Sequence, residues 1–68
     1  MVDTNRLKSV LVLNGTTGEA VAKELGMSSK TFYLRMKKGV FGSDEIEKMI
    51  DLLKIEDPMP IFFAKEVT

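Results

Sequence analysis

Apolar residues recur along this chain at spacings of three and four, which predicts short helices. The most regular stretch follows Ser43, where apolar side chains recur at helical spacing: Ile46, Met49, Ile50 and Leu53. This i, i+3, i+4, i+7 pattern places all of them on one face of a helix. Asp44 and Glu45 fall in its first turn, where acidic groups suit the helix dipole. The pattern therefore predicts an amphipathic helix that starts at Ser43.

The N-terminal stretch has a shorter apolar repeat. Leu7, Val10 and Leu11 share one helical face, and the following Asn14-Gly15 is a good helix stop. Asp3, Thr4 and Asn5 are all suitable N-caps. The stretch from about residue 4 to 13 is thus expected to be a helix. Its valines are weak helix formers, so a strand is the alternative.

Two short helices are predicted between residues 16 and 39. Thr16 and Glu19 have the spacing of a capping box, which would begin a helix of about eight or nine residues that ends at Gly26. Ser28 then caps a second helix that Gly39 closes. Phe32 and Met36 share the buried face of this second helix, with Leu34 or Arg35 at its margin.

The turn between these two helices is about three or four residues long, which sets helices at a steep angle. Each position has a residue type that such a turn needs. Ala22 is small at the closest approach, Gly26 accepts a positive φ, and Met27 fills the angle. Val21 and Phe32 are expected to hold the two helices together from inside.

The last apolar stretch, from Pro58 to Ala64, reads as a short helix or an irregular strap. Pro58 is expected at the first helical position, after Asp57 as a cap. Ile61, Phe62 and Phe63 would complete the core. The fold class expected for residues 1–68 is therefore all-α, a compact bundle of four to five short helices in a single domain.

Charge is unevenly spread along this neutral chain, which has ten Lys and Arg and ten Asp and Glu. Residues 28–39 hold four cations and no acid, whereas residues 40–68 hold three cations and seven acids. A neutral total can therefore hide a basic face beside an acidic one.

The composition argues against an enzyme. The chain has no cysteine and no histidine, which removes thiolate chemistry, the usual general base and the commonest metal ligand. We expect no catalytic residues, no cofactor and no metal. The longest apolar run near the N-terminus, Val10 to Leu13, is far shorter than the ~20 residues of a membrane span. The expected location is the cytoplasm, with no membrane partner.

The segment "TTGEAVAKELGMSSKTF" resembles the helix-turn-helix of the phage lambda repressor and Cro family. The positions that carry the likeness are Ala22, Gly26, Met27, Ser28, Thr31 and Phe32. The later segments "VFGSDEIEKMIDLL" and "IFFA" are similar to small phage regulators of Gram-positive hosts, so the likeness covers about residues 5–64. It implies a lambda-repressor-like helix-turn-helix at about residues 17–38, in a sequence-specific, double-stranded DNA-binding transcriptional regulator of phage or prophage origin.

The resemblance also implies the DNA-binding residues. The second helix, about residues 28–38, would lie in the major groove, with Ser29 and Lys30 reaching base edges. Tyr33 would touch a base or a phosphate, or rest on its own domain. Phosphates would meet Lys37, Lys38 and Arg35, and also the helix starts at Thr17 and Ser28.

Two positions depart from the family pattern. Gly18 stands where the family commonly has a glutamine that fixes the complex on the DNA backbone, and Arg35 stands where the family often has an apolar residue. Met36 takes that core role one position later.

The expected partner is a double-stranded DNA operator, occupied by two copies of the protein as a homodimer on DNA. The alternative is a protein-interaction module, such as an antirepressor that binds a larger phage repressor rather than DNA. In either case the tail Met59 to Val67 and the nearby Met49 and Leu52 are the expected contact surface for a second protein.

Overall fold

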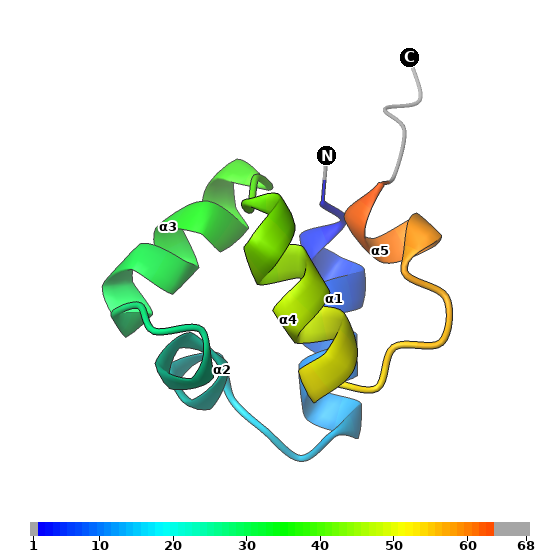
Figure 1. Ribbon diagram of the computed structural model, residues 1–68, viewed down its shortest axis with the longest axis horizontal. Coiled ribbons are helices and arrows are strands. Elements are labelled where there is room, and N and C mark those ends of the chain that lie inside the picture. The colour runs from blue at the N-terminus through cyan, green and yellow to red at the C-terminus, as the bar shows by residue number, and fades with distance from the viewer. Residues whose placement is uncertain (1, 64–68) are drawn as a thin grey trace.

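The computed structural model describes residues 2–63, and over this range the chain forms five short helices and no strand. The all-α prediction is therefore confirmed, and residues 4–13 form a helix rather than a strand. In Figure 1, α2 and α3 occupy one side of the molecule, α5 occupies the other, and α4 crosses in front of α1. The helices are α1 (Thr4–Leu13), α2 (Gly18–Glu24), α3 (Ser29–Lys38), α4 (Ser43–Leu52) and α5 (Met59–Phe62).

The first three helices begin at side-chain caps. Asp3 accepts a hydrogen bond from the Arg6 N–H at 3.1 Å, and Thr17 accepts one from the Ala20 N–H at 3.2 Å. The capping box predicted for Thr16 and Glu19 is wrong, because the helix begins one residue later and Ala20 occupies the third helical position. The start of α4 is different, since the Glu45 carboxylate accepts a hydrogen bond from the Gly42 N–H at 2.7 Å.

Four helices end in the same way. Just after each helix, a residue with positive φ turns the chain, and the next N–H bonds back to the carbonyl five residues earlier. The positive-φ residues are Gly15, Gly26, Gly39 and Lys54. The matching N–H to O bonds are Thr16 to Leu11, Met27 to Ala22, Val40 to Arg35 and Ile55 to Ile50. The three glycines were predicted helix ends, whereas Lys54 was not.

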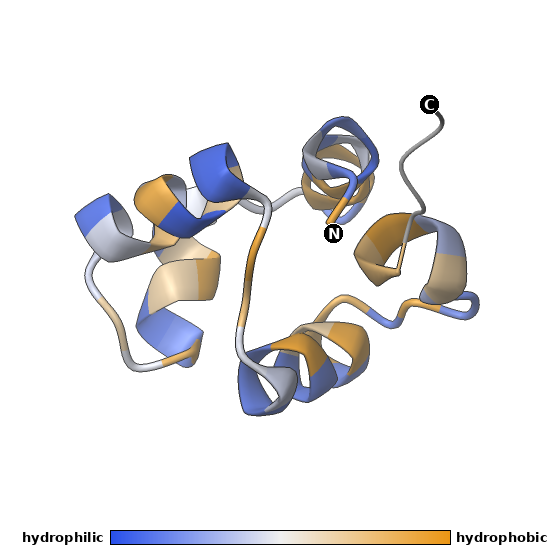
Figure 2. Cartoon of the chain, turned by 90° about the horizontal axis from the view of Figure 1, so that it is seen from above, coloured by the Kyte–Doolittle hydropathy of each residue, from blue (hydrophilic) through white to orange (hydrophobic). Residues whose placement is uncertain are grey.

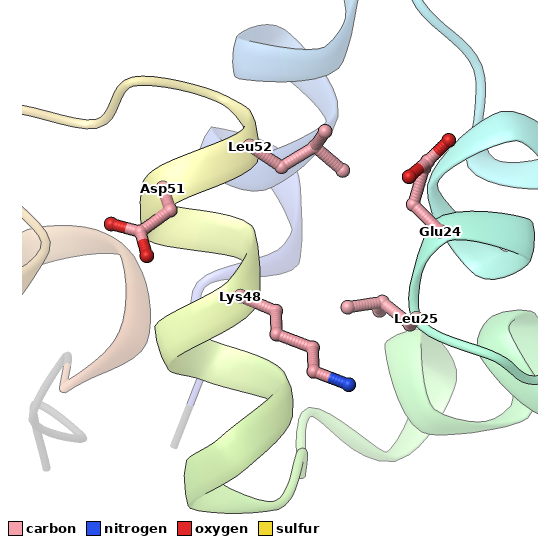
Figure 3. Close-up of a pocket in the computed structure, with 5 residues that line it drawn as sticks. All are labelled: Glu24, Leu25, Lys48, Asp51 and Leu52. Atoms are coloured by element: carbon pink, nitrogen blue, oxygen red, sulfur yellow. The ribbon is translucent and has the colours of Figure 1, made fainter.

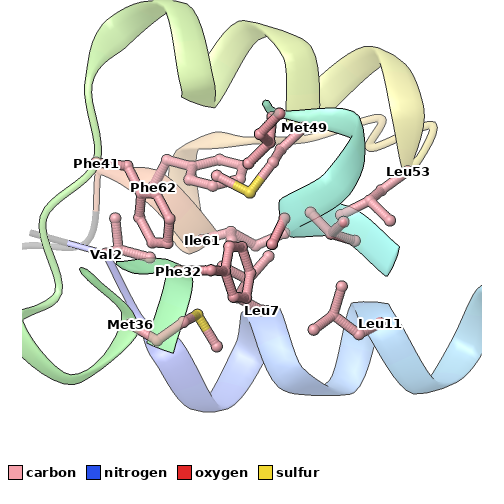
Figure 4. Packing of buried hydrophobic residues seen from close by; sticks show 13 residues of the cluster. Val2, Leu7, Leu11, Phe32, Met36, Phe41, Met49, Leu53, Ile61 and Phe62 are labelled. Atoms are coloured by element: carbon pink, nitrogen blue, oxygen red, sulfur yellow. The ribbon is translucent and has the colours of Figure 1, made fainter. Parts of the chain in front are cut away.

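The core gathers apolar side chains from all five helices around Phe32, as Figure 4 shows. Phe32 is fully buried, and its ring lies 5.5 Å from that of Phe41, centroid to centroid. Phe41 belongs to the connection between α3 and α4, which is why a search for helical spacing did not place it in the core. The predicted apolar face of α4 is confirmed, and Figure 2 shows that face turned toward the middle of the molecule.

The C-terminal helix closes the core. Ile61 and Phe62 are buried, whereas Phe63 is half exposed. Pro58 is the N-cap of α5 rather than its first helical residue, so that prediction is wrong by one position. A hydrogen bond of 2.6 Å from the Asp3 N–H to the Ile61 carbonyl ties α5 to the start of α1.

The surface expected to contact a second protein changes in one respect. Met49 is fully buried and therefore does not belong to it, whereas Leu52 and Met59 are exposed. The rest of the predicted surface, residues 64–67, lies outside the described residues.

Candidate nucleic-acid interface

The helices α2 and α3 form the closest helix pair of the domain and are joined by a four-residue turn, residues 25–28. Gly26 has a φ of +75°, and the Met27 N–H bonds to the Ala22 carbonyl at 3.0 Å. Ala22 is buried, and Met27 packs against the core from its edge. The residues predicted to shape this turn therefore lie where the prediction placed them, although α2 is slightly shorter than expected.

One face of α3 points away from the core. It carries Lys30, Leu34, Lys37 and Lys38, which we call the outer face of α3. Their spacing of four, three and one residues puts them on one side of the helix, opposite the buried Phe32 and Met36, and all four are exposed. The helix contains no acidic residue. The predicted lysines thus share one exposed basic surface.

Either Leu34 or Arg35 was expected at the margin of the buried face, and the partly buried Arg35 takes this place while Leu34 does not. The side chain of Leu34 is 50% exposed and lies in the middle of the outer face. The sequence does contain the signal, because residues two before and two after a helical position lie about 160° away from it. Burial of Phe32 and Met36 therefore implies exposure of Leu34.

The predicted serine and threonine contacts sit at the helix starts. Ser28 caps α3 by accepting a hydrogen bond from the Thr31 N–H at 3.1 Å, and its hydroxyl lies 3.0 Å from the Thr31 hydroxyl. Thr17 caps α2 in the same manner. Both caps are exposed, whereas Ser29 is only partly so. Their first role is local, since each satisfies a free N–H group of its helix.

Tyr33 lies at the edge of the outer face and rests on α2. Its ring makes an edge-to-face contact with Phe32, with centroids 5.7 Å apart. On the α2 side it fills the space above Gly18, where a Cβ atom would lie only 2.5 Å from the tyrosine hydroxyl oxygen. The absent side chain of Gly18 therefore makes room for Tyr33, which is still 49% exposed.

Arg35 is not part of the outer face. Its guanidinium pairs with the Glu45 carboxylate at 2.8 Å, and the same oxygen accepts the Gly42 N–H that begins α4. Arg35 thus links the end of α3 to the start of α4. The phosphate contact expected of Arg35 does not fit this arrangement.

A hollow of about 330 Å³ lies between α2 and α4, away from the outer face of α3. Figure 3 shows Lys48 and Leu52 of α4 pointing across it toward Glu24 and Leu25, while Asp51 points away. The hollow is open and carries both signs of charge, so it has no preference for an anion. Within residues 2–63, no group of acidic side chains is arranged to hold a metal ion, and no helix is both long and apolar enough to cross a membrane.

No protein-family model, curated protein or solved structure matches the chain. The outer face of α3 is therefore the main feature that bears on the function of the protein.

Proposed function

We propose that the protein is a sequence-specific, double-stranded DNA-binding transcriptional regulator of the Cro and repressor type, which inserts α3 into the major groove. The observation that carries the proposal is the outer face of α3, where three lysines gather with no acid. The major groove is about 12 Å wide and admits one helix of this kind. Four residues join α2 to α3, and Tyr33 in the first half of α3 rests on Gly18 of α2.

Position along α3 suggests a different role for each lysine. Lys30 lies in the first turn of α3, the part that reaches base edges in helix-turn-helix proteins. A lysine there favours the acceptor atoms of guanine. Lys37 and Lys38 lie in the last turn and would neutralise phosphates. Tyr33 is held at the flank by Gly18 and would meet the sugar-phosphate backbone through its hydroxyl.

The proposal is tested by the salt dependence of duplex binding. If each subunit neutralises about three to five phosphates, the logarithm of the association constant falls with the logarithm of salt concentration, with a slope of about −0.9 per phosphate. Fluorescence anisotropy with a labelled duplex measures this slope. Lys37→Ala should weaken all duplexes alike and reduce the slope by about one, whereas Lys30→Ala should also change the preferred sequence.

The matched control is Lys48→Ala, because Lys48 is an exposed lysine on α4 and faces the hollow of Figure 3. It should leave both slope and affinity unchanged. Salt-independent binding, or a Lys30→Ala protein with wild-type affinity and preference, would contradict the role of α3.

The proposal includes no catalysis, cofactor or metal. An operator with two half-sites about one DNA turn apart would bring two copies together. The protein would then act by occupying its operator in the cytoplasm of a bacterial host.

A second candidate function is binding to a larger phage repressor, as an antirepressor does. It is favoured by the acidic residues of α4, among them Asp44, Glu47 and Asp51, next to the exposed Leu52. A gel shift at low salt with non-specific duplex separates the two functions. An α3 that meets DNA will retard the duplex, whereas a purely protein-binding module will not.

A further inference from the structure

The middle of the outer face of α3 is apolar. Leu34 lies there, half exposed, with Lys30 one turn before it and Lys37 and Lys38 one turn after it. The helical rise of 1.5 Å per residue puts Lys30 and Lys38 each about 6 Å from Leu34 along the axis. Leu34 therefore has lysines on both sides of it along the helix axis.

This combination restricts what can cover Leu34. A single exposed leucine is ordinary by itself, but any partner that buries this one must also accept the lysines around it. A suitable partner offers negative charge on both sides of a small apolar group. The major groove of DNA has this layout, because phosphates line its two edges and the thymine 5-methyl group projects from its floor.

The apolar side chain of Leu34 also limits which group of a base pair it can contact. Leucine has no hydrogen-bonding group, so the acceptors and donors of the base edges gain nothing from it. The thymine methyl is the apolar group that a base pair presents in the major groove. Tyr33 does not obstruct the approach, because its ring is seated on Gly18 at the flank.

We propose that Leu34 is a specificity-determining residue that packs against the 5-methyl group of a thymine in each half-site. This inference rests on the proposed function, since it requires α3 to enter the major groove. It adds an apolar reader to the lysine contacts and makes the protein distinguish thymine from uracil at one position.

The test removes the methyl group alone. Duplexes that bind wild-type protein are first selected from a randomised pool, and each thymine of the selected site is then replaced singly by deoxyuridine. Burial of one methyl or methylene group corresponds to about four-fold in affinity. We expect one thymine per half-site at which the replacement weakens wild-type binding about four-fold, and Leu34→Ala protein to bind thymine and uracil duplexes equally there.

Leu13→Ala is the matched control. Leu13 is an exposed leucine, 85%, and lies on α1 rather than α3. This variant should keep the four-fold preference for thymine. Alanine is a good helix former, so Leu34→Ala protein should remain folded, which its circular dichroism melt will verify.

The outcomes distinguish failure of the role of Leu34 from failure of the proposed DNA-binding function. If selected duplexes bind well but no thymine responds to loss of its methyl group, or if Leu34→Ala protein responds as wild type does, the role of Leu34 is overturned while the DNA-binding function stands. If wild-type protein selects no duplex at all, the proposed function fails, the role of Leu34 fails with it, and the outer face of α3 is instead assigned to a protein contact.

Discussion

At the scale of single residues, Gly18 and Tyr33 form one unit. The glycine at the start of α2 has no Cβ, and the phenol ring of Tyr33 occupies the space that a Cβ would need. Gly18 has an ordinary helical backbone and is not required for a positive φ. Its absent side chain therefore sets where Tyr33 lies, and with it the flank of the outer face of α3.

Gly18→Ala should displace the ring of Tyr33 with little change in stability. The ring can swing outward on its two torsions, and alanine is a better helix former than glycine, so the free energy of unfolding should change by no more than about 0.5 kcal/mol. Tyr33 is the only tyrosine and the chain has no tryptophan. Quenching of intrinsic tyrosine fluorescence by acrylamide should therefore increase.

Gly42→Ala is the control for this experiment. It makes the same change at the start of another helix, where the nearest atoms to an added Cβ belong to Glu45 rather than Tyr33. Tyrosine quenching should not change in that variant. Equal quenching in Gly18→Ala and wild-type protein would mean that Tyr33 does not rest on Gly18.

At the scale of secondary structure, α1 to α4 all end at a residue with positive φ, but this residue is not a glycine in every case. Gly15, Gly26 and Gly39 adopt positive φ without a steric cost, whereas Lys54 adopts a φ of 52° with a full side chain. The left-handed conformation costs a non-glycine residue about 1–2 kcal/mol. The end of α4 is therefore the strained one.

Lys54→Gly should stabilise the domain. Relief of the left-handed strain outweighs the extra chain entropy of glycine, so we expect a gain of about 0.5 kcal/mol in the free energy of unfolding. Gly26→Ala is the mirror experiment, because an added Cβ would meet no atom within 4 Å and only the φ of +75° opposes it. It should lose about 1 kcal/mol. Thermal melts that move both variants in the same direction would contradict this account of the helix ends.

The contact between α2 and α3 gives a second prediction at this scale. Ala22 is buried on α2, the helix that packs most closely with α3. Ala22→Leu adds three carbons there, and overpacking of this kind costs about 1–3 kcal/mol. The melting temperature should fall by several degrees or more. An Ala22→Leu protein that melts like Ala20→Leu, a matched change at an exposed position of α2, would show that the interface is loosely packed.

At the scale of the whole molecule, the basic residues of α3 are separated from the acidic residues of the second half. Three lysines lie together on the outer face of α3, and most acids of the second half lie on and after α4. Exposed apolar side chains remain on other elements: Val12 and Leu13 on α1, and Met59 and Phe63 at α5. In the proposed function, the outer face of α3 meets DNA, and the surface around Met59 is left for a second copy.

Met59→Asp should weaken cooperative binding to a two-site duplex and leave binding to a single half-site unchanged. Loss of a partly buried methionine contact is worth about 1 kcal/mol, or roughly five-fold in affinity. Val12→Asp is the control, since Val12 is exposed on another helix. Light scattering and DNA titration measure the effect. Unchanged cooperativity in Met59→Asp protein would remove α5 from the dimer contact.

The sequence by itself determined the helices and most of their ends. Apolar spacing of three and four residues, a serine or threonine cap, and glycine after a helix act within one or two turns, so they can be read without knowing the fold. This local chemistry also determined the α2–α3 turn and the exposure of Lys30, Lys37 and Lys38. Even Leu34 was determined in this way, because burial of its neighbours at two positions on either side requires it to point outward.

The tertiary structure decided what depends on residues distant in sequence. Arg35 belongs to Glu45 rather than to the basic face, since α4 begins beside the last turn of α3. Phe41 joins the core from a connection without periodicity, where it packs on Phe32. The seat of Tyr33 on Gly18 joins residues of two helices, and only their packing shows that a missing side chain on one makes room for the ring of the other.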